Sequence, residues 1–71
     1  MPSDRQHDEI PQHLRRLIPF IAQGYSNAEI ANDLGLSKHT VENYVSALTE
    51  IVGVANRLQL LIWAQSLDER R

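Results

Sequence analysis

Apolar residues recur every three or four positions along most of the chain, a spacing typical of amphipathic helices. The stripe between residues 11 and 23 consists of Leu14, Leu17, Ile18, Phe20 and Ile21. Pro11 suits the first turn of such a helix, where its missing N–H costs nothing. Pro19 removes a hydrogen bond inside the helix and crowds the carbonyl of Arg15. We therefore expect a helix over 11–23 that is kinked, or broken into two pieces, near Pro19.

Capping residues mark the next two helices. Ser26 and Glu29 form an S-x-x-E capping box, and Ser37 caps the following helix. Glycines at positions 24, 35 and 53 suit the left-handed conformation that ends a helix. The predicted helices span 26–34 and 37–51. Their inward stripes are Ile30, Ala31 and Leu34 in the first, and Val41, Tyr44, Val45 and Leu48 in the second.

A fourth helix is predicted over 56–67, capped by Asn56 with Gln59 as its capping-box partner. Its apolar residues point in nearly every direction. Leu58, Leu61 and Ile62 share one side, and Leu60, Trp63, Ala64 and Leu67 share another. A short helix that is apolar nearly all round needs more than one partner surface. Trp63 fits the core and an interface equally well on this pattern.

Composition limits the classes of protein further. The chain has 71 residues and no cysteine, which allows one domain and no disulfide or thiolate metal site. Its histidines, at positions 7, 13 and 39, lack the spacing of a zinc site, so we expect no metal and no cofactor. No apolar run reaches the ~18 residues of a membrane span, and the N-terminus is not a signal peptide. These features favour a cytoplasmic protein with a disordered arm at 1–9, a helical domain at 10–67 and a solvated tail at 68–71.

The most specific pattern combines these elements. The residues IAQGYSNAEIANDLGLSKHTVENYVSAL, followed by GVANRLQLLIWA, lie within 21–64. In order and spacing they resemble the LuxR/FixJ-type (GerE-like) helix-turn-helix domain of bacterial transcription regulators. The resemblance covers roughly residues 10–66. It implies an all-α, compact four-helix fold with a central helix-turn-helix, whose third helix enters the major groove of DNA and whose fourth helix often forms a dimer contact.

Candidate DNA-binding residues follow from the third helix. Its N-terminal end can hold a phosphate through Lys38, His39 and Thr40. Glu42, Asn43 and Ser46 fall where family members usually contact bases, and each side chain has suitable donors or acceptors. Arg57 matches a family arginine just after the third helix and joins this set. The resemblance further implies a homodimer through the fourth helix, with Leu60, Trp63, Ala64 and Leu67 as contacts.

Charge argues against strong DNA binding. The net charge is −2 and the pI about 5.8, whereas a duplex-binding domain often has a pI above ~9. Glu42 and Ile51 stand where the family usually has lysine, and Tyr44 where it usually has histidine. An exposed Ile51 beside Tyr44 would mark a contact patch, although Ile51 packing inward is equally consistent with the pattern.

Two function classes therefore remain. The first is sequence-specific DNA binding in transcription control. The alternative is a protein-interaction module that binds another regulator through the fourth helix and the Ile51 region. No catalytic constellation or glycine-rich phosphate loop is recognisable, so we do not expect an enzyme.

Overall fold

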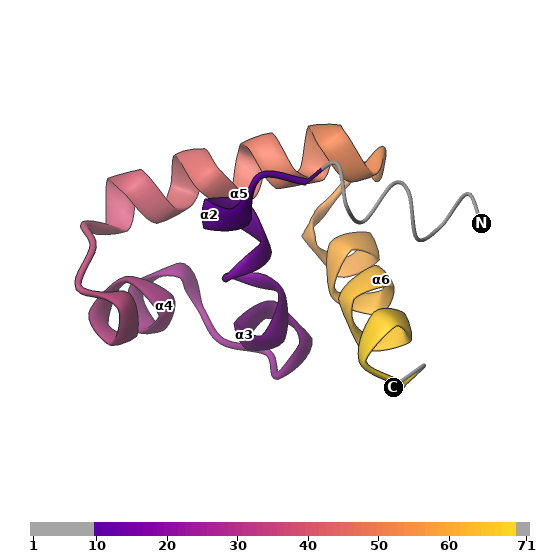
Figure 1. Cartoon of the computed structure of the whole chain (residues 1–71), viewed down its shortest axis with the longest axis horizontal. Coiled ribbons are helices and arrows are strands. Elements are labelled where there is room, and N and C mark those ends of the chain that lie inside the picture. The colour runs from indigo at the N-terminus through magenta and orange to yellow at the C-terminus, as the bar shows by residue number, and fades with distance from the viewer. Residues whose placement is uncertain (1–9, 70–71) are drawn as a thin grey trace.

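The computed structural model describes residues 10–69, with side chains placed through residue 67, and the regular secondary structure of this part is all helical (Figure 1). The helices are α2 (Gln12–Arg15), α3 (Ile18–Ala22), α4 (Asn27–Leu34), α5 (Lys38–Val52) and α6 (Arg57–Glu69). The all-α prediction is confirmed. The arm predicted at 1–9 lies outside the described residues, as does the last part of the predicted tail. Residues 68 and 69 belong to α6, which ends two residues later than predicted.

The predicted first helix is broken into α2 and α3, one of the two outcomes expected from Pro19. The break falls at Arg16 and Leu17, upstream of the proline itself. Leu17 N–H bonds the carbonyl of Leu14, at 3.0 Å, which closes α2 with a tighter turn. Pro19 then lies in the first turn of α3. Breaking the helix upstream places Pro19 where a backbone N–H would have no helical partner anyway.

The predicted caps are present. The Ser26 hydroxyl accepts from the N–H of Glu29 at 3.1 Å, and the Glu29 carboxylate accepts from the N–H of Ser26 at 2.8 Å. The Asn56 side chain accepts from the N–H of Gln59 at 2.9 Å. The Gln59 side chain reaches back to the N–H of Ala55 rather than to that of Asn56. The starts of α4 and α6 thus satisfy backbone donors that no helical carbonyl can reach, whereas α2 and α3 begin without a side-chain cap.

The helices pack as two pairs around a shared core. α5 lies along one side of the molecule, with α4 packed against it, while α3 packs against α6 (Figure 1). α2 also contacts α5, and α5 and α6 meet at 71°. The core side chains are all apolar: Ile10, Leu14, Leu17, Ile18, Ile21, Ile30, Ala31, Val41, Val45, Leu48, Leu60 and Ala64. They come from every described helix, so burying them fixes how the helices are arranged.

The orientation of α6 corrects one prediction. Leu60 and Ala64 were expected to contact a second subunit, but they are 0% and 1% exposed within a single chain. Trp63 and Leu67 are half-buried and pack against the same core. The large apolar side chains that α6 leaves in solvent are Leu58 and Ile62, one turn apart and 64% and 57% exposed. The expectation was wrong because an almost uniformly apolar helix does not reveal which side faces its own core.

Within the described residues, no single helix is both long and apolar enough to cross a membrane. Taken together, α5 and α6 (through Leu67) pass that test by length and composition, as a pair bent by 71°.

Candidate nucleic-acid interface

A tight turn joins α4 to α5 and sets the direction of α5. Gly35 ends α4 in the left-handed conformation, with φ of 71°, which glycine adopts without the steric cost of a Cβ. The N–H of Leu36 returns to the carbonyl of Ala31 at 2.9 Å. The chain then starts α5 at Lys38 after only one further residue, Ser37. Two helices separated by so short a turn, and packed against each other, form a helix-turn-helix.

The start of α5 is held by a hydroxyl pair. The N–H of Thr40 donates to the hydroxyl oxygen of Ser37 at 3.0 Å, and the Ser37 hydroxyl donates to that of Thr40 at 2.8 Å. Thr40 is half-buried, whereas Lys38 and His39 are exposed. The amino end of a helix carries partial positive charge and unpaired N–H groups. Lys38 and His39 therefore stand beside backbone donors that favour an anion.

The outward side of α5 presents polar side chains to solvent. Glu42, Asn43 and Ser46 are all exposed, as predicted, while Val41, Val45 and Leu48 on the opposite side are buried. Glu42 offers only acceptors, Asn43 offers both donors and acceptors, and the Ser46 hydroxyl can do either. We call Lys38, His39, Glu42, Asn43 and Ser46 the outward face of α5.

The outward face carries a close pair of opposite sign. Nδ1 of His39 lies 4.0 Å from a carboxylate oxygen of Glu42, an ion pair when the imidazole is protonated. Both side chains are open to solvent, 81% and 47% exposed, so the attraction is weak. The pair also places the Glu42 carboxylate near the amino end of α5.

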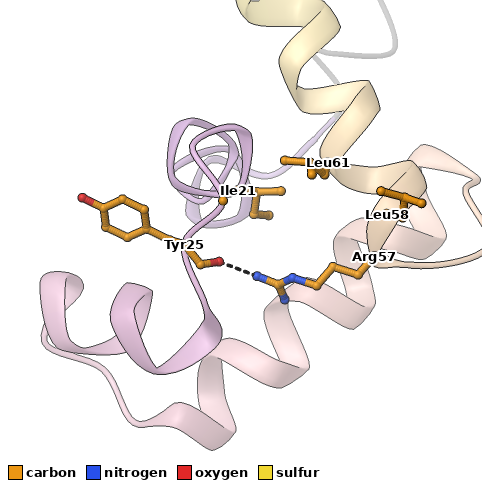
Figure 2. Close-up of a pocket in the computed structure, with 6 residues that line it drawn as sticks. Ile21, Tyr25, Arg57, Leu58 and Leu61 are labelled. Carbon is orange, nitrogen blue, oxygen red and sulfur yellow. Dashed lines mark hydrogen bonds between the residues drawn. The ribbon is translucent and has the colours of Figure 1, made fainter.

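Arg57 is not grouped with the outward face. Its guanidinium donates from Nη1 to the side-chain oxygen of Asn27 at 2.6 Å. It also donates from Nη2 to the carbonyl of Tyr25 at 2.7 Å (Figure 2). Asn27 and Tyr25 lie 30 and 32 residues earlier in the chain. No local sequence pattern predicts these partners, because side chains so far apart in the chain meet only through the tertiary fold.

Arg57 also borders a shallow hollow of about 250 Å³ between α3 and α6 (Figure 2). The other lining residues are Ile21, Gly24, Tyr25, Leu58 and Leu61. Figure 2 shows the guanidinium directed from α6 toward the Tyr25 backbone, with the aliphatic side chains to one side. The hollow is thus mostly apolar, with one cation at its edge.

Where α5 packs beside α2, it presents an aromatic side chain, in contrast to the polar outward face. The Tyr44 ring is half-buried and meets the ring of His13 edge to face, with 4.9 Å between centroids. The sequence did not predict this contact, and His13 is otherwise exposed. Ile51 is 40% exposed, which favours the exposed alternative considered for it. Within the described residues, no group of three histidine or acidic side chains is placed to hold a metal ion.

Comparison with known proteins places this geometry in context. The model of a family described as "Bacterial regulatory proteins, luxR family" matches residues 15–64. The chain is 35% identical over 57 residues to the DNA-binding transcriptional activator DevR/DosR of Mycobacterium tuberculosis, covering 80% of this chain and 26% of that protein. It is 34% identical over 47 residues to the probable transcriptional regulator ycf29 of Guillardia theta, covering 66% and 23%.

A third relative is the HTH-type transcriptional regulator MalT of Yersinia pestis, 30% identical over 70 residues, which cover 86% of this chain and 8% of MalT. The chain therefore spans only about a quarter, or less, of the length of these relatives.

Proposed function

The chain belongs to the luxR family of bacterial regulatory proteins, and from this premise we propose that it binds double-stranded DNA sequence-specifically to regulate transcription. The family is one of transcription regulators and not of enzymes. A regulator that binds bacterial chromosomal DNA works in the cytoplasm, which is where we place this chain.

One observation carries the proposal: the outward face of α5 is open to solvent and is not covered by the described part of the chain. α4 packs against α5 and leaves the outward face free. A major groove is wide enough to admit a helix, so α5 can enter it with this face toward the bases. The described helices bury no polar or charged residue, so the polar side chains of α5 are not needed for core packing.

Each residue of the interface has a separate role in the proposal. Lys38, His39 and Thr40 lie at the amino end of α5 and bind phosphate, with the backbone N–H groups there. Asn43 pairs with an adenine through two hydrogen bonds, Glu42 accepts from the amino group of a cytosine, and Ser46 bonds either way. A glutamate at position 42 favours binding only against a base edge, because beside a phosphate it repels.

Charge makes a second subunit important. Residues 22–62 contain fewer basic than acidic side chains. The basic residues are Lys38 and Arg57, and the acidic residues are Glu29, Asp33, Glu42 and Glu50. Few phosphate contacts give weak binding per domain. We propose that the chain acts as a homodimer through α6, whose exposed Leu58 and Ile62 replace the buried pair first expected. Two half-sites then add their contacts.

A salt titration tests the proposal. The full chain is first mixed with a pool of random-sequence duplexes at low salt, and the bound duplexes are selected and sequenced. The affinity for the most enriched duplex is then measured at increasing salt concentrations. A DNA-binding regulator enriches one motif and loses affinity with a slope of about −0.9 per phosphate contact. Absence of any duplex binding at low salt would refute the proposal.

The second candidate is a module that binds another regulator protein and not DNA. The acidic excess within residues 22–62 and the exposed apolar pair on α6 favour it. In the titration above, this candidate gives no duplex binding at the lowest salt while α6 still associates with a protein partner. The DNA-binding proposal remains the better supported, since the outward face is uncovered.

A further inference from the structure

α6 is tied to both ends of the segment that connects α3 with α4. At the first end, Nε2 of Gln65 donates to the carbonyl of Ala22, the last residue of α3, at 3.1 Å. At the second end, Arg57 donates to the carbonyl of Tyr25 and to the side chain of Asn27, the first residue of α4. Both acceptors of Arg57 therefore lie where α4 begins.

This connection joins the two packed pairs of the fold. α3 packs against α6, and α4 packs against α5. Gly24 lies in the connecting segment with φ of 85°, a conformation that puts a sharp turn into the backbone. The shared core and the contacts of α5 with α2 and α6 also hold the two pairs together, and this segment is a covalent link between them. A guanidinium that donates to two acceptors at once is well suited to hold it, because its planar fork fixes both directions.

We propose that Arg57 is a positioning residue for DNA recognition: it fixes the start of α4, and so the direction in which α5 presents its outward face, relative to α6. The inference rests on the proposed function for its link to DNA. Arg57 then contributes to binding through Asn27 and Tyr25 and not by touching a phosphate. If α6 also carries the second subunit, the same contact fixes how the two copies of α5 are spaced on DNA.

Two variants separate this role from phosphate binding. Arg57→Lys keeps the positive charge but loses the planar fork, and Asn27→Ala removes one acceptor while leaving Arg57 in place. With a positioning role, both variants lower the ratio of specific to non-specific DNA affinity about tenfold, and neither changes the salt slope of binding. Asn32→Ala, an exposed asparagine elsewhere on α4, serves as the matched control and leaves the ratio unchanged.

A phosphate contact predicts the opposite pattern. Arg57→Lys would then keep most of the affinity, Asn27→Ala would have no effect, and Arg57→Ala would reduce the salt slope by about 0.9. That result would overturn the inference. A role in stability alone would lower the unfolding midpoint of both variants without changing the affinity ratio measured well below that midpoint, and would also overturn it.

A measurement on the free protein keeps this test independent of DNA binding. Residual dipolar couplings report the orientation of α4 and α5 relative to α3 and α6. In Arg57→Lys and Asn27→Ala, couplings within each pair should match the wild type, while the relative orientation of the pairs changes or becomes averaged. Unchanged relative orientation in both variants refutes the positioning role, whatever the wild-type chain does with DNA. Failure of the wild type to bind any duplex, with altered orientation in the variants, refutes the DNA-binding function instead.

Discussion

Nδ1 of His39 lies 4.0 Å from the carboxylate of Glu42, one helical turn farther along α5. The pair sets a carboxylate and an imidazole next to the amino end of the helix, where anions are otherwise favoured. A phosphate bound near this end would be attracted by Lys38 and repelled by the Glu42 carboxylate that lies beside His39. If the chain binds DNA as proposed, Glu42 would repel the phosphate backbone of a non-specific duplex and favour a base edge that can donate to it.

The first prediction concerns this balance. Glu42→Lys should raise the affinity for a mixed-sequence duplex and steepen the salt slope by about 0.9 if the new ammonium gains one phosphate contact. Fluorescence anisotropy with a labelled duplex over a range of salt measures both. Glu50→Lys is the charge-matched control, roughly 12 Å farther along the same helix at 1.5 Å per residue. Equal gains from both variants would show that only net charge matters, and no gain from Glu42→Lys would place residue 42 away from DNA.

The second prediction concerns base contact. Asn43→Ala should weaken binding to the selected duplex by about 1–3 kcal/mol and barely change binding to unrelated duplex. Because Asn43 is exposed, the unfolding midpoint should stay nearly constant. Titration calorimetry and thermal unfolding measure the two effects, with Asn32→Ala as an exposed control on α4. Unchanged specific affinity would remove Asn43 from the base-contacting set.

The third prediction compares two leucines of α6. Leu60→Ala should reduce the free energy of unfolding by about 2–5 kcal/mol, because the side chain is fully buried. Leu58→Ala, two residues away and 64% exposed, should change it by no more than about 0.5 kcal/mol. Urea denaturation of dilute protein gives both values. A larger loss from Leu58→Ala than from Leu60→Ala would mean that α6 is rotated relative to the structure.

The fourth prediction concerns self-association. Replacing Leu58 and Ile62 together by glutamine should shift the chain toward monomer, since both side chains lie on the exposed side of α6. Sedimentation velocity over a concentration series measures the shift. Ile51→Gln is the control, as an exposed isoleucine on α5. If only the control disrupts association, the contact lies on the α5 flank and not on α6.

The fifth prediction tests the capping box. Ser26→Ala should cost about 1 kcal/mol of stability, because the N–H of Glu29 loses its acceptor at the start of α4. Ser66→Ala, at an exposed position on α6, should have almost no effect. Chemical denaturation compares the two. Equal stability of both variants would show that the Ser26 cap is replaced by water without cost.

Local chemistry determined much of this protein in advance. The capping residues Ser26, Ser37 and Asn56 and the glycines at 35 and 53 act on backbone groups within four residues of themselves. Their positions in the sequence therefore predicted both ends of α4 and α5, and the start of α6, to within one residue. The same holds for the outward face of α5, because a helix with a clear apolar stripe on one side leaves its polar side to solvent.

Tertiary structure decided what no local pattern contains. α6 is apolar in nearly every direction, so only its packing on α3 and α5 selected Leu60 and Ala64 for the core and left Leu58 and Ile62 outside. Arg57 found Tyr25 and Asn27 across 30 or more residues of sequence. Backbone capping acts over a few residues and is encoded where it acts. Which of several apolar sides of a helix is buried is decided only when the helices pack together. The same is true of a hydrogen bond between segments that are distant in the sequence.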